Sequence, residues 1–230
     1  MDGQSGSMLY TASTWIIPAI LAITLHEAAH GYAARRFGDT TAWALGRVSL
    51  NPFKHIDPFG TIILPGLLLL ARSPFLFGYA KPVPVNFSRL RNPKTDMVWV
   101  ALAGPGTNIV LAVISALLLH LANYLPQAAM DWVTRNLVNS ILINVVLAVF
   151  NMIPIPPLDG GRVAVGLLPE PLSRPLAELE PYGFFVIIGL VFVLPLLGQN
   201  LGLNLNFIST IISSISDVIV GAILAMSGLR

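Results

Sequence analysis

The sequence predicts an all-α polytopic membrane protein, with about five transmembrane helices and a re-entrant or short β region between the first and second full spans. Of its 230 residues, 55% are hydrophobic and only 10% are charged, whereas about 25% are charged in an ordinary soluble domain. The mean hydropathy is +0.75, and several apolar stretches approach the roughly 20 residues that a helix needs to cross a bilayer. These values exclude a soluble globular domain and a disordered chain.

The charge balance and the cysteine content narrow the class further. The 13 Lys and Arg residues against 11 Asp and Glu residues give a formal net charge of +2, an excess too small to indicate a nucleic-acid partner. There is no cysteine, so disulfides and thiolate metal ligands are excluded, and any metal must be bound by His and carboxylate groups. The partner that the composition does indicate is the lipid bilayer.

The expected spans follow from the apolar stretches in chain order. The first covers Thr14–Phe37, and we expect it to be retained because residues 1–13 carry no Lys or Arg, unlike the start of a secretory signal peptide. The later spans are long apolar stretches with few charges, and two prolines shorten the regular part of the fourth. They cover Met97–Ala122, Leu137–Ile153, Leu179–Leu197 and Phe207–Met226.

The apolar stretch Phe59–Ala71 is too short for a span and contains Pro65-Gly66. Lys and Arg are enriched on the cytoplasmic side of membrane proteins, so their positions test whether this stretch crosses. If the stretch enters the membrane and returns to the same side, every Lys and Arg except Arg135 lies on one side of the membrane. If it crosses, the basic residues between positions 35 and 94 are divided almost evenly between the two sides. We therefore predict a re-entrant segment, an outside N-terminus and a cytoplasmic C-terminus in a prokaryotic cell membrane.

Two short extended pieces are expected in the long connection after the first span. Ala42–Leu50 has β-branched and aromatic residues between turn signals. In Lys81–Phe87, each proline favours an extended conformation of the residue before it. The sequence therefore predicts short β structure on the cytoplasmic side.

The strongest local motif is His26-Glu27-Ala28-Ala29-His30, inside the first span. Residues four apart share a helix face, so both imidazoles can reach one metal ion while Glu27 lies beside them as a base. A charged group at the centre of a span costs roughly 2.5–3.5 kcal/mol, so three ionisable groups within one turn need a shared compensating partner. A divalent cation supplies it better than a neighbouring helix or a snorkelling Glu27 does.

A catalytic zinc site usually has three protein ligands, so a third must come from elsewhere in the chain. The candidates are His55, Asp57, His120 and Asp159. Asp159 is the best of them, because three prolines between residues 154 and 157 leave irregular backbone, which at membrane depth persists only around protein or a wet cavity. A solvated turn is the alternative for Asp159. A loop role is favoured for His55 and Asp57, and His120 is expected to be inert at the interface.

Together these motifs resemble the site-2 proteases, intramembrane zinc metalloproteases with HExxH in one span and NxxPxxxLDG in a later one. The second pattern is matched by Asn151, Pro154, Leu158, Asp159 and Gly160. We expect residues 1–230 to form a single membrane domain. The resemblance covers about residues 14–165, which we expect to be its catalytic core. The helices at about 175–228 match only as generic spans. We expect a compact form without PDZ or cystathionine-β-synthase domains. Another family-like stretch contains Gly104-Pro105 and Asn108, for which close helix packing is expected.

The resemblance implies a Zn²⁺ ion bound by His26, His30 and Asp159. It also implies that Glu27 is the general base and that Asn151 stabilises the tetrahedral intermediate, although helix capping is the alternative for Asn151. The implied activity is hydrolysis of peptide bonds in or near transmembrane segments of membrane proteins, either a transmembrane helix or a signal-peptide remnant. The oligomeric state is left open.

Two other functions could use the same residues. In a membrane metal transporter or metal-binding protein, the His and Asp cluster would be a transit site, but outside it the spans carry little more than Asp217. A prenyl-protein endopeptidase would need a downstream glutamate ligand on a helix, whereas the glutamates between residues 170 and 180 lie in a proline-broken segment. For the protease, the two extended pieces are candidates for an edge strand that binds unwound substrate, or alternatively for a hairpin that covers the site.

Overall fold

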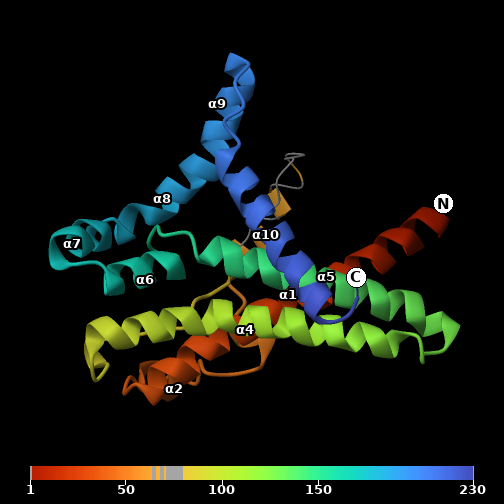
Figure 1. Cartoon of the computed structure of the whole chain (residues 1–230), viewed down its shortest axis with the longest axis horizontal. Helices are drawn as coiled ribbons and strands as arrows, with labels where there is room; N and C mark the ends of the chain where they lie inside the picture. Colours follow the sequence, from red (N-terminus) through yellow and green to blue (C-terminus); the bar gives the residue numbers. More distant parts are fainter. Residues whose placement is uncertain (1, 64–65, 68–69, 71–79, 230) are drawn as a thin grey trace.

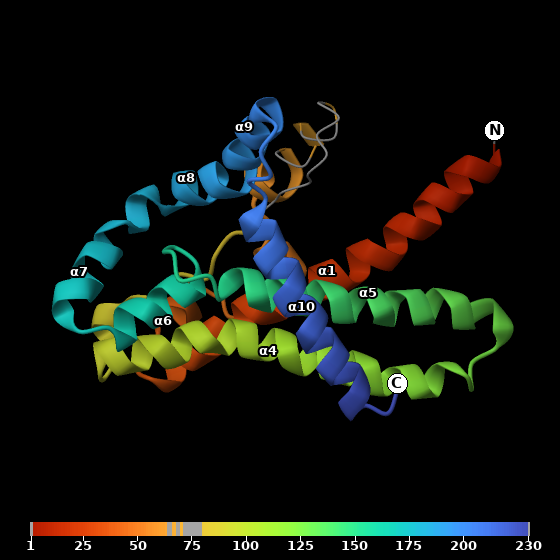
Figure 2. The same ribbon diagram turned by 45° about the horizontal axis from the view of Figure 1, so that its top comes forward.

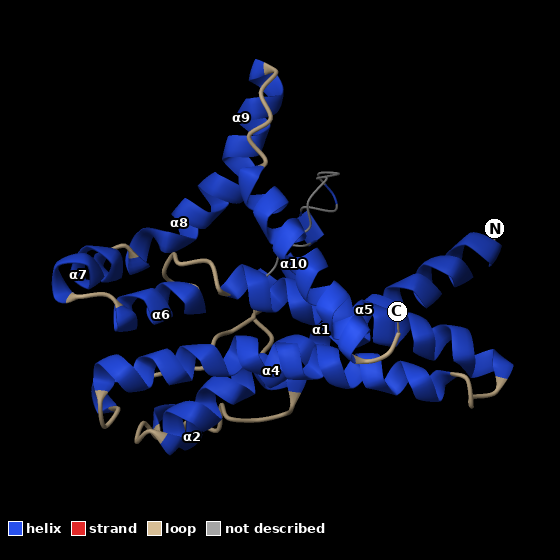
Figure 3. Cartoon of the chain, viewed as in Figure 1, coloured by secondary structure: helices blue, strands red, loops and turns tan. Residues whose placement is uncertain are grey.

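The computed structural model describes residues 2–63, 66–67, 70 and 80–229, and these residues are helical or irregular, with no β-strand among them (Figure 3). Within these described residues, five helical segments are long and apolar enough to cross a membrane, as the sequence predicts. They are Leu9–Arg36, Pro93–Ala122, Ala129–Asn151, Glu170–Leu201 and Phe207–Met226. The chain is therefore an integral membrane protein.

Three long helices form the centre of the fold: α1 (Asp2–Arg36), α4 (Pro93–Ala122) and α5 (Gln127–Asn151). α4 packs along both of the others, and α5 also contacts α1. Fully buried alanines at the contacts, such as Ala112 and Ala116, allow the helices to approach closely. Figure 1 shows that α1 and α5 run in the same direction, with α4 antiparallel to both. The HExxH motif and the chain that follows α5 therefore lie at similar positions along the bundle.

The outer face of α4 carries a stripe of exposed apolar side chains. They recur about once per helical turn, at Val110, Ile114, Leu117, Leu118 and Leu121. Such a stripe would be an aggregation hazard in water but is suited to contact with lipid tails. It supports the assignment of α4 as a membrane span.

The last helix, α10 (Phe207–Met226), crosses over α5 and α4 in both views (Figures 1 and 2). Its buried Ile223 joins a core cluster with Ala112 and Ala116 of α4 and with Ile141, Val145 and Val149 of α5. α10 is thus anchored on the side of α4 and α5 by apolar packing.

The fourth span is a composite of short helices, as its prolines predict. After α6 (Asp159–Leu167), the chain forms α7 (Glu170–Glu178), the 3₁₀ turn η4 (Glu180–Tyr182), α8 (Gly183–Ile188), the π-helix η5 (Gly189–Val193) and α9 (Leu194–Leu201). Pro181 lies in η4 and Pro195 in the first turn of α9. Figure 2 shows α8 and α9 rising away from the three central helices.

The structure does not support the re-entrant or short β region predicted between the first and second spans. The described part of this connection contains α2 (Thr41–Ala44), the 3₁₀ turns η1 (Pro52–Lys54) and η3 (Phe87–Arg89), and the π-helix η2 (Pro58–Ile63). The rest of the expected re-entrant stretch lies partly outside the described residues, at positions 64–65, 68–69 and 71.

The two pieces predicted to be extended are joined by a side chain rather than by a strand ladder. Pro82 and Pro84 have no N–H to donate, so residues 81–86 form no regular structure. Instead, Nη2 of Arg47 donates to the carbonyl oxygens of Lys81, at 2.9 Å, and Pro82, at 3.2 Å. The prediction of short β structure is therefore wrong for these residues, although the two pieces do lie together.

Asp39, just after α1, explains why residues 41–44 are helical. Its buried carboxylate accepts hydrogen bonds from the N–H and the hydroxyl of Thr41 and, at 2.7 Å, from the N–H of Asn86. The contact with Thr41 starts a turn, as Asp side chains commonly do. Burial alone would raise the pKa of Asp39, but these hydrogen bonds outweigh burial and hold that pKa below its ordinary value.

Candidate metal centre

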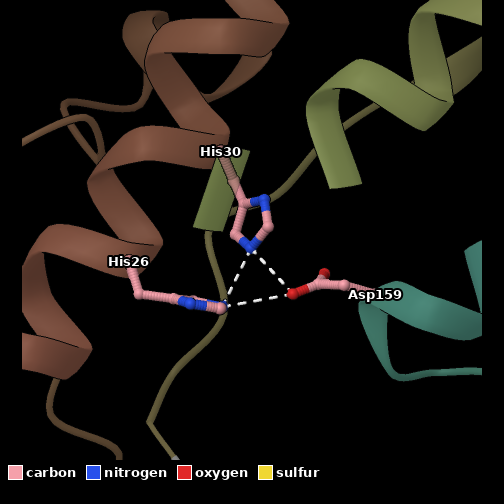
Figure 4. A group of neighbouring side chains, drawn as sticks. All are labelled: His26, His30 and Asp159. Carbon is pink, nitrogen blue, oxygen red and sulfur yellow. Dashed lines mark hydrogen bonds and ion pairs between the residues drawn. The ribbon is translucent and has the colours of Figure 1, made fainter. Parts of the chain in front are cut away.

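His26 and His30 lie one turn apart on α1, and their rings face Asp159, the first residue of α6 (Figure 4). The Nε2 atoms of the two rings are 3.0 Å apart, and Oδ2 of Asp159 is 3.3 Å from each of them. All three side chains are buried. The structure thus brings together the three residues that the sequence predicts as metal ligands.

The ring of His26 is oriented by Asn108 of α4. Nδ1 of His26 is 2.6 Å from Oδ1 of Asn108, and the amide nitrogen of Asn108 is 3.3 Å from the carbonyl oxygen of Ala22. A backbone carbonyl can only accept, so the Asn108 amide turns its nitrogen toward Ala22 and its oxygen toward His26. Nδ1 of His26 therefore carries the proton, and Nε2 keeps a lone pair that faces the other two residues.

The ring of His30 is held in the same tautomer by a backbone group. Its Nδ1 is 2.7 Å from the carbonyl oxygen of Val100 on α4. Because that oxygen can only accept, Nδ1 of His30 is the donor and Nε2 is left with a lone pair.

In the part of the chain that the structure describes, three acceptor atoms consequently converge with no donor between them. Oδ2 of Asp159 is buried and has no hydrogen-bond partner among the described residues. A single proton would satisfy only part of this arrangement, whereas a divalent cation satisfies all three atoms. For tetrahedral zinc with bonds of about 2.0–2.2 Å, neighbouring ligand atoms lie about 3.3–3.6 Å apart, which is close to the observed 3.0 and 3.3 Å. The three residues therefore fit zinc.

Gly104 allows α4 to approach the two histidines. A Cβ atom at this position would collide with Nε2 of His30 and would lie 2.6 Å from Cε1 of His26. A Cβ atom at Gly106, on the same helix, would have no neighbour within 4 Å. The histidine pair thus requires glycine at position 104 but not at position 106.

The chain between α5 and α6 places Asp159. Its prolines end α5 at Asn151, and the chain then turns back so that α6 begins with the aspartate. A Cβ atom at Gly160 would collide with the backbone of Met152 and would lie 2.6 Å from the carbonyl oxygen of Ile153. The glycine therefore lets the start of α6 press against the end of α5, which sets the depth of Asp159.

The three residues lie in a cavity of about 460 Å³ that Glu27 and Asn151 also line. All five residues predicted for the site therefore share one cavity. Oε2 of Glu27 accepts a hydrogen bond of 2.7 Å from the N–H of Val83. Asn151 donates to the carbonyl oxygen of Leu147 at 2.9 Å, which fixes its side chain at the end of α5.

The other candidate ligands lie elsewhere. Nε2 of His55 is 2.8 Å from the carbonyl oxygen of Ser49, and Oδ1 of Asp57 accepts from the N–H of Gly60 at 2.7 Å. Both residues therefore have the loop role that the sequence favours. His120 is exposed and pairs with the carbonyl oxygen of Ser227 at 2.6 Å.

Sequence reasoning missed the groups that orient the proposed ligands. The sequence predicts only helix packing for Asn108. It does not point to the N–H of Val83, which donates to Glu27, or to the side chain of Asn144, which contacts Asn108. One available signal was the spacing of Asn108, four residues after Gly104 and therefore on the face of α4 that meets the histidines.

A bundle of membrane-spanning helices that holds two imidazoles and a carboxylate around one buried point is the arrangement expected of a membrane metallopeptidase. Comparison with known proteins agrees. Residues 120–196 match Peptidase family M50. A Bacillus subtilis (strain 168) protein named "Putative zinc metalloprotease YwhC" is 40% identical over 79% of this chain and 80% of its own length.

More distant relatives carry similar names. "Putative zinc metalloprotease Rip2" of Mycolicibacterium smegmatis is 32% identical over 75% of this chain and 64% of its own length. "Putative zinc metalloprotease MJ0611" of Methanocaldococcus jannaschii is 32% identical over 60% of this chain and 62% of its own length. No solved structure matches the chain. The chain belongs to peptidase family M50, the site-2 protease family, and is a zinc metalloendopeptidase of the membrane.

Proposed function

We propose that the protein hydrolyses peptide bonds in or near transmembrane segments of membrane proteins, with zinc bound by His26, His30 and Asp159. The observation that carries this proposal is the convergence of three acceptor atoms in a cavity shared with Glu27 and Asn151, with no donor between them among the residues the structure describes. When bound, zinc supplies a Lewis acid that polarises the scissile carbonyl and acidifies water. The chain supplies the base, the oxyanion donor and the walls of the site.

Glu27 is the proposed general base. It follows His26 directly on α1 and lines the cavity, and one of its two carboxylate oxygens is held by the N–H of Val83. The other oxygen can accept a proton from the attacking water and later pass it to the leaving amine. Proton transfer by a positioned carboxylate typically contributes about 10²–10⁴-fold to the rate.

Asn151 is the proposed oxyanion donor. An amide nitrogen has two N–H groups, and in Asn151 one of them is used to fix the side chain against Leu147. The second can donate to the negative charge that develops on the scissile carbonyl oxygen. One such donor is typically worth about 3–4 kcal/mol of transition-state stabilisation.

The walls of the cavity support an apolar, membrane-derived substrate. Apart from the site residues, its lining is dominated by aliphatic and aromatic side chains, including Ile23, Leu147, Phe150, Phe184 and Ile187. A transmembrane helix or a signal-peptide remnant supplies apolar side chains for such walls. Because a helix hides its carbonyl groups in its own hydrogen bonds, the bond to be cut must first be locally unwound.

A metal transporter is less well supported. Among the described residues, His26, His30 and Asp159 are the one group of three or more His, Cys, Asp or Glu side chains that could hold a metal ion. A transit path would need further ligands along the spans.

We further propose that the N-terminus lies outside and the C-terminus in the cytoplasm of a prokaryotic cell. The support is the distribution of Lys and Arg, which leaves only Arg135 on the outer side. The proposed topology also requires α1 and α5 to run in parallel, as they do in Figure 1.

The test combines zinc content with cleavage of a membrane-protein substrate by the purified full chain. Glu27→Gln is expected to keep zinc and lose turnover by about 10²–10⁴-fold, whereas Asp159→Ala is expected to lose both. Asp131→Ala, an exposed carboxylate near the start of α5, is the matched control and should keep both. Full turnover by Glu27→Gln, or full zinc occupancy in Asp159→Ala, contradicts the proposal.

A further inference from the structure

A chain of buried polar side chains leads from His26 into the interior of the helix bundle. Asn108 is fully buried, and its amide nitrogen donates to Oδ1 of Asn144 on α5 at 2.8 Å. Asn144 is 1% exposed. Its own amide nitrogen donates to the carbonyl oxygen of Ser140 at 2.9 Å and lies 3.2 Å from the Ser140 hydroxyl. Three helices, α1, α4 and α5, are thus linked by one polar path that ends at a proposed metal ligand.

The hydrogen bonds of this path have a single consistent direction. The carbonyl oxygen of Ser140 can only accept, so the amide nitrogen of Asn144 faces it and the amide oxygen of Asn144 faces Asn108. That oxygen in turn holds the Asn108 nitrogen, which leaves the Asn108 oxygen for the ring of His26. The backbone of α5, acting through two side-chain amides, therefore reinforces the Ala22 carbonyl in fixing which nitrogen of His26 carries the proton.

We propose that Asn144 is a positioning residue for the zinc site, acting through Asn108 to keep His26 in the tautomer whose Nε2 is free to bind metal. This inference rests on the proposed function, because it takes His26 as a zinc ligand. Removing a group that orients a metal-binding histidine commonly weakens metal affinity.

Removing Asn144 leaves the Asn108 nitrogen with the carbonyl oxygen of Ala22 alone, at the longer distance of 3.3 Å. Only this weaker contact then opposes turnover of the Asn108 amide, so a larger fraction of molecules presents the amide nitrogen to Nδ1 of His26. That contact requires Nδ1 to be the acceptor and places the ring proton on Nε2, which then cannot bind zinc. The reversed orientation of the Asn108 amide results from loss of its hydrogen bond to Asn144. A loss of helix packing alone would not produce it.

Asn139 provides a matched control for the packing role of a buried asparagine. It is on the same helix, is 9% exposed, and its amide nitrogen donates to the carbonyl oxygen of Thr14 on α1 at 2.9 Å. Its bond reaches α1 but does not lead to the histidines. Replacing Asn139 by leucine therefore removes a similar buried hydrogen bond between α5 and its neighbour without touching the path to His26.

The experiment measures zinc affinity by competition with a chelator, using the purified full chain. Asn108→Leu is expected to weaken zinc binding by about 10–100-fold. Asn144→Leu should weaken it by a smaller factor, because the Ala22 carbonyl still holds Asn108, while Asn139→Leu keeps the wild-type affinity. Because Asn144 acts through Asn108, the double variant should bind zinc no more weakly than Asn108→Leu alone, which is the non-additivity of a coupled pair. Asn144→Ser, whose hydroxyl is too short to reach Asn108, replaces Asn144→Leu if that variant does not fold.

The outcomes separate this inference from the proposed function. If His26→Ala abolishes zinc binding but Asn144→Leu and Asn144→Ser match Asn139→Leu, the positioning role is wrong and the proposed function stands. Additive losses in the double variant also overturn the positioning role, because they show that Asn144 acts independently of Asn108. If His26→Ala binds zinc like the wild type, the proposed function and this inference fall together.

Discussion

Replacing Gly104 by alanine adds one methyl group where α4 meets the histidine pair. The new Cβ atom would collide with Nε2 of His30 and would lie 2.6 Å from Cε1 of His26, whereas carbon atoms in contact are normally about 3.5–4.0 Å apart. The rings must therefore move by about 1 Å, which exceeds the roughly 0.5 Å within which a functional site must be held. We expect Gly104→Ala to weaken zinc binding by at least about 10-fold, the lower end of the losses caused by misplaced ligand support.

Gly106→Ala is the control for the change in helix propensity. Both positions lie inside α4, so alanine stabilises the helix by up to about 1 kcal/mol in each variant, but position 106 has open space for the methyl group. The assay is chelator competition for zinc, with thermal unfolding of the same samples to show that both variants are folded. Wild-type zinc affinity in Gly104→Ala would refute the packing of α4 against the histidines.

Three further predictions follow from other parts of the chain. Because the pKa of Asp39 is lower in the folded state than in the unfolded chain, its stabilising effect is present above the unfolded value and is lost as the pH falls through the folded value. Asp39→Asn should therefore lower the Tm at pH 7, and its difference from wild type should shrink progressively as the pH falls below about 4. A difference that is unchanged by acid would show that the charge is irrelevant. Since the chain has no cysteine, single introduced cysteines can report its topology. Asn123→Cys should react with a membrane-impermeant maleimide in intact cells, whereas Ser88→Cys should react only after lysis. The reverse pattern would show that the proposed orientation is inverted. Gly160→Ala should lose zinc binding because its methyl group would meet backbone, and retention of zinc would mean that the placement of Asp159 tolerates movement of α6.

The parts of the fold that the sequence predicts are those that depend on short-range patterns. The five spans follow from the length of apolar stretches. Helices α1 and α5 nevertheless begin before the predicted starts at Thr14 and Leu137, because a helix can include polar residues that lie outside the apolar stretch. The spacing of His26 and His30 on one helix face is also a local property. Asp159 could be found because the prolines before it mark irregular backbone at membrane depth.

The parts that could not be predicted depend on how separate segments meet. The contact of Asn108 with His26 requires the crossing point of α4 on α1, which apolar stretches do not encode. The β prediction fails because β-branched residues and prolines favour an extended backbone without supplying the hydrogen bonds of a strand ladder. Pro82 and Pro84 have no N–H to donate to one. The one N–H between those prolines, that of Val83, binds Glu27 instead.

The most direct measurement of the zinc site is X-ray absorption at the zinc edge of the purified, zinc-loaded chain. Two imidazole ligands and oxygen donors at about 2.0–2.2 Å are expected, and the zinc signal should be lost when Asp159 is replaced by alanine. A spectrum with a different number of imidazoles, or one that the Asp159→Ala substitution leaves unchanged, would show that zinc binds elsewhere and would contradict the assignment of His26, His30 and Asp159 as its ligands.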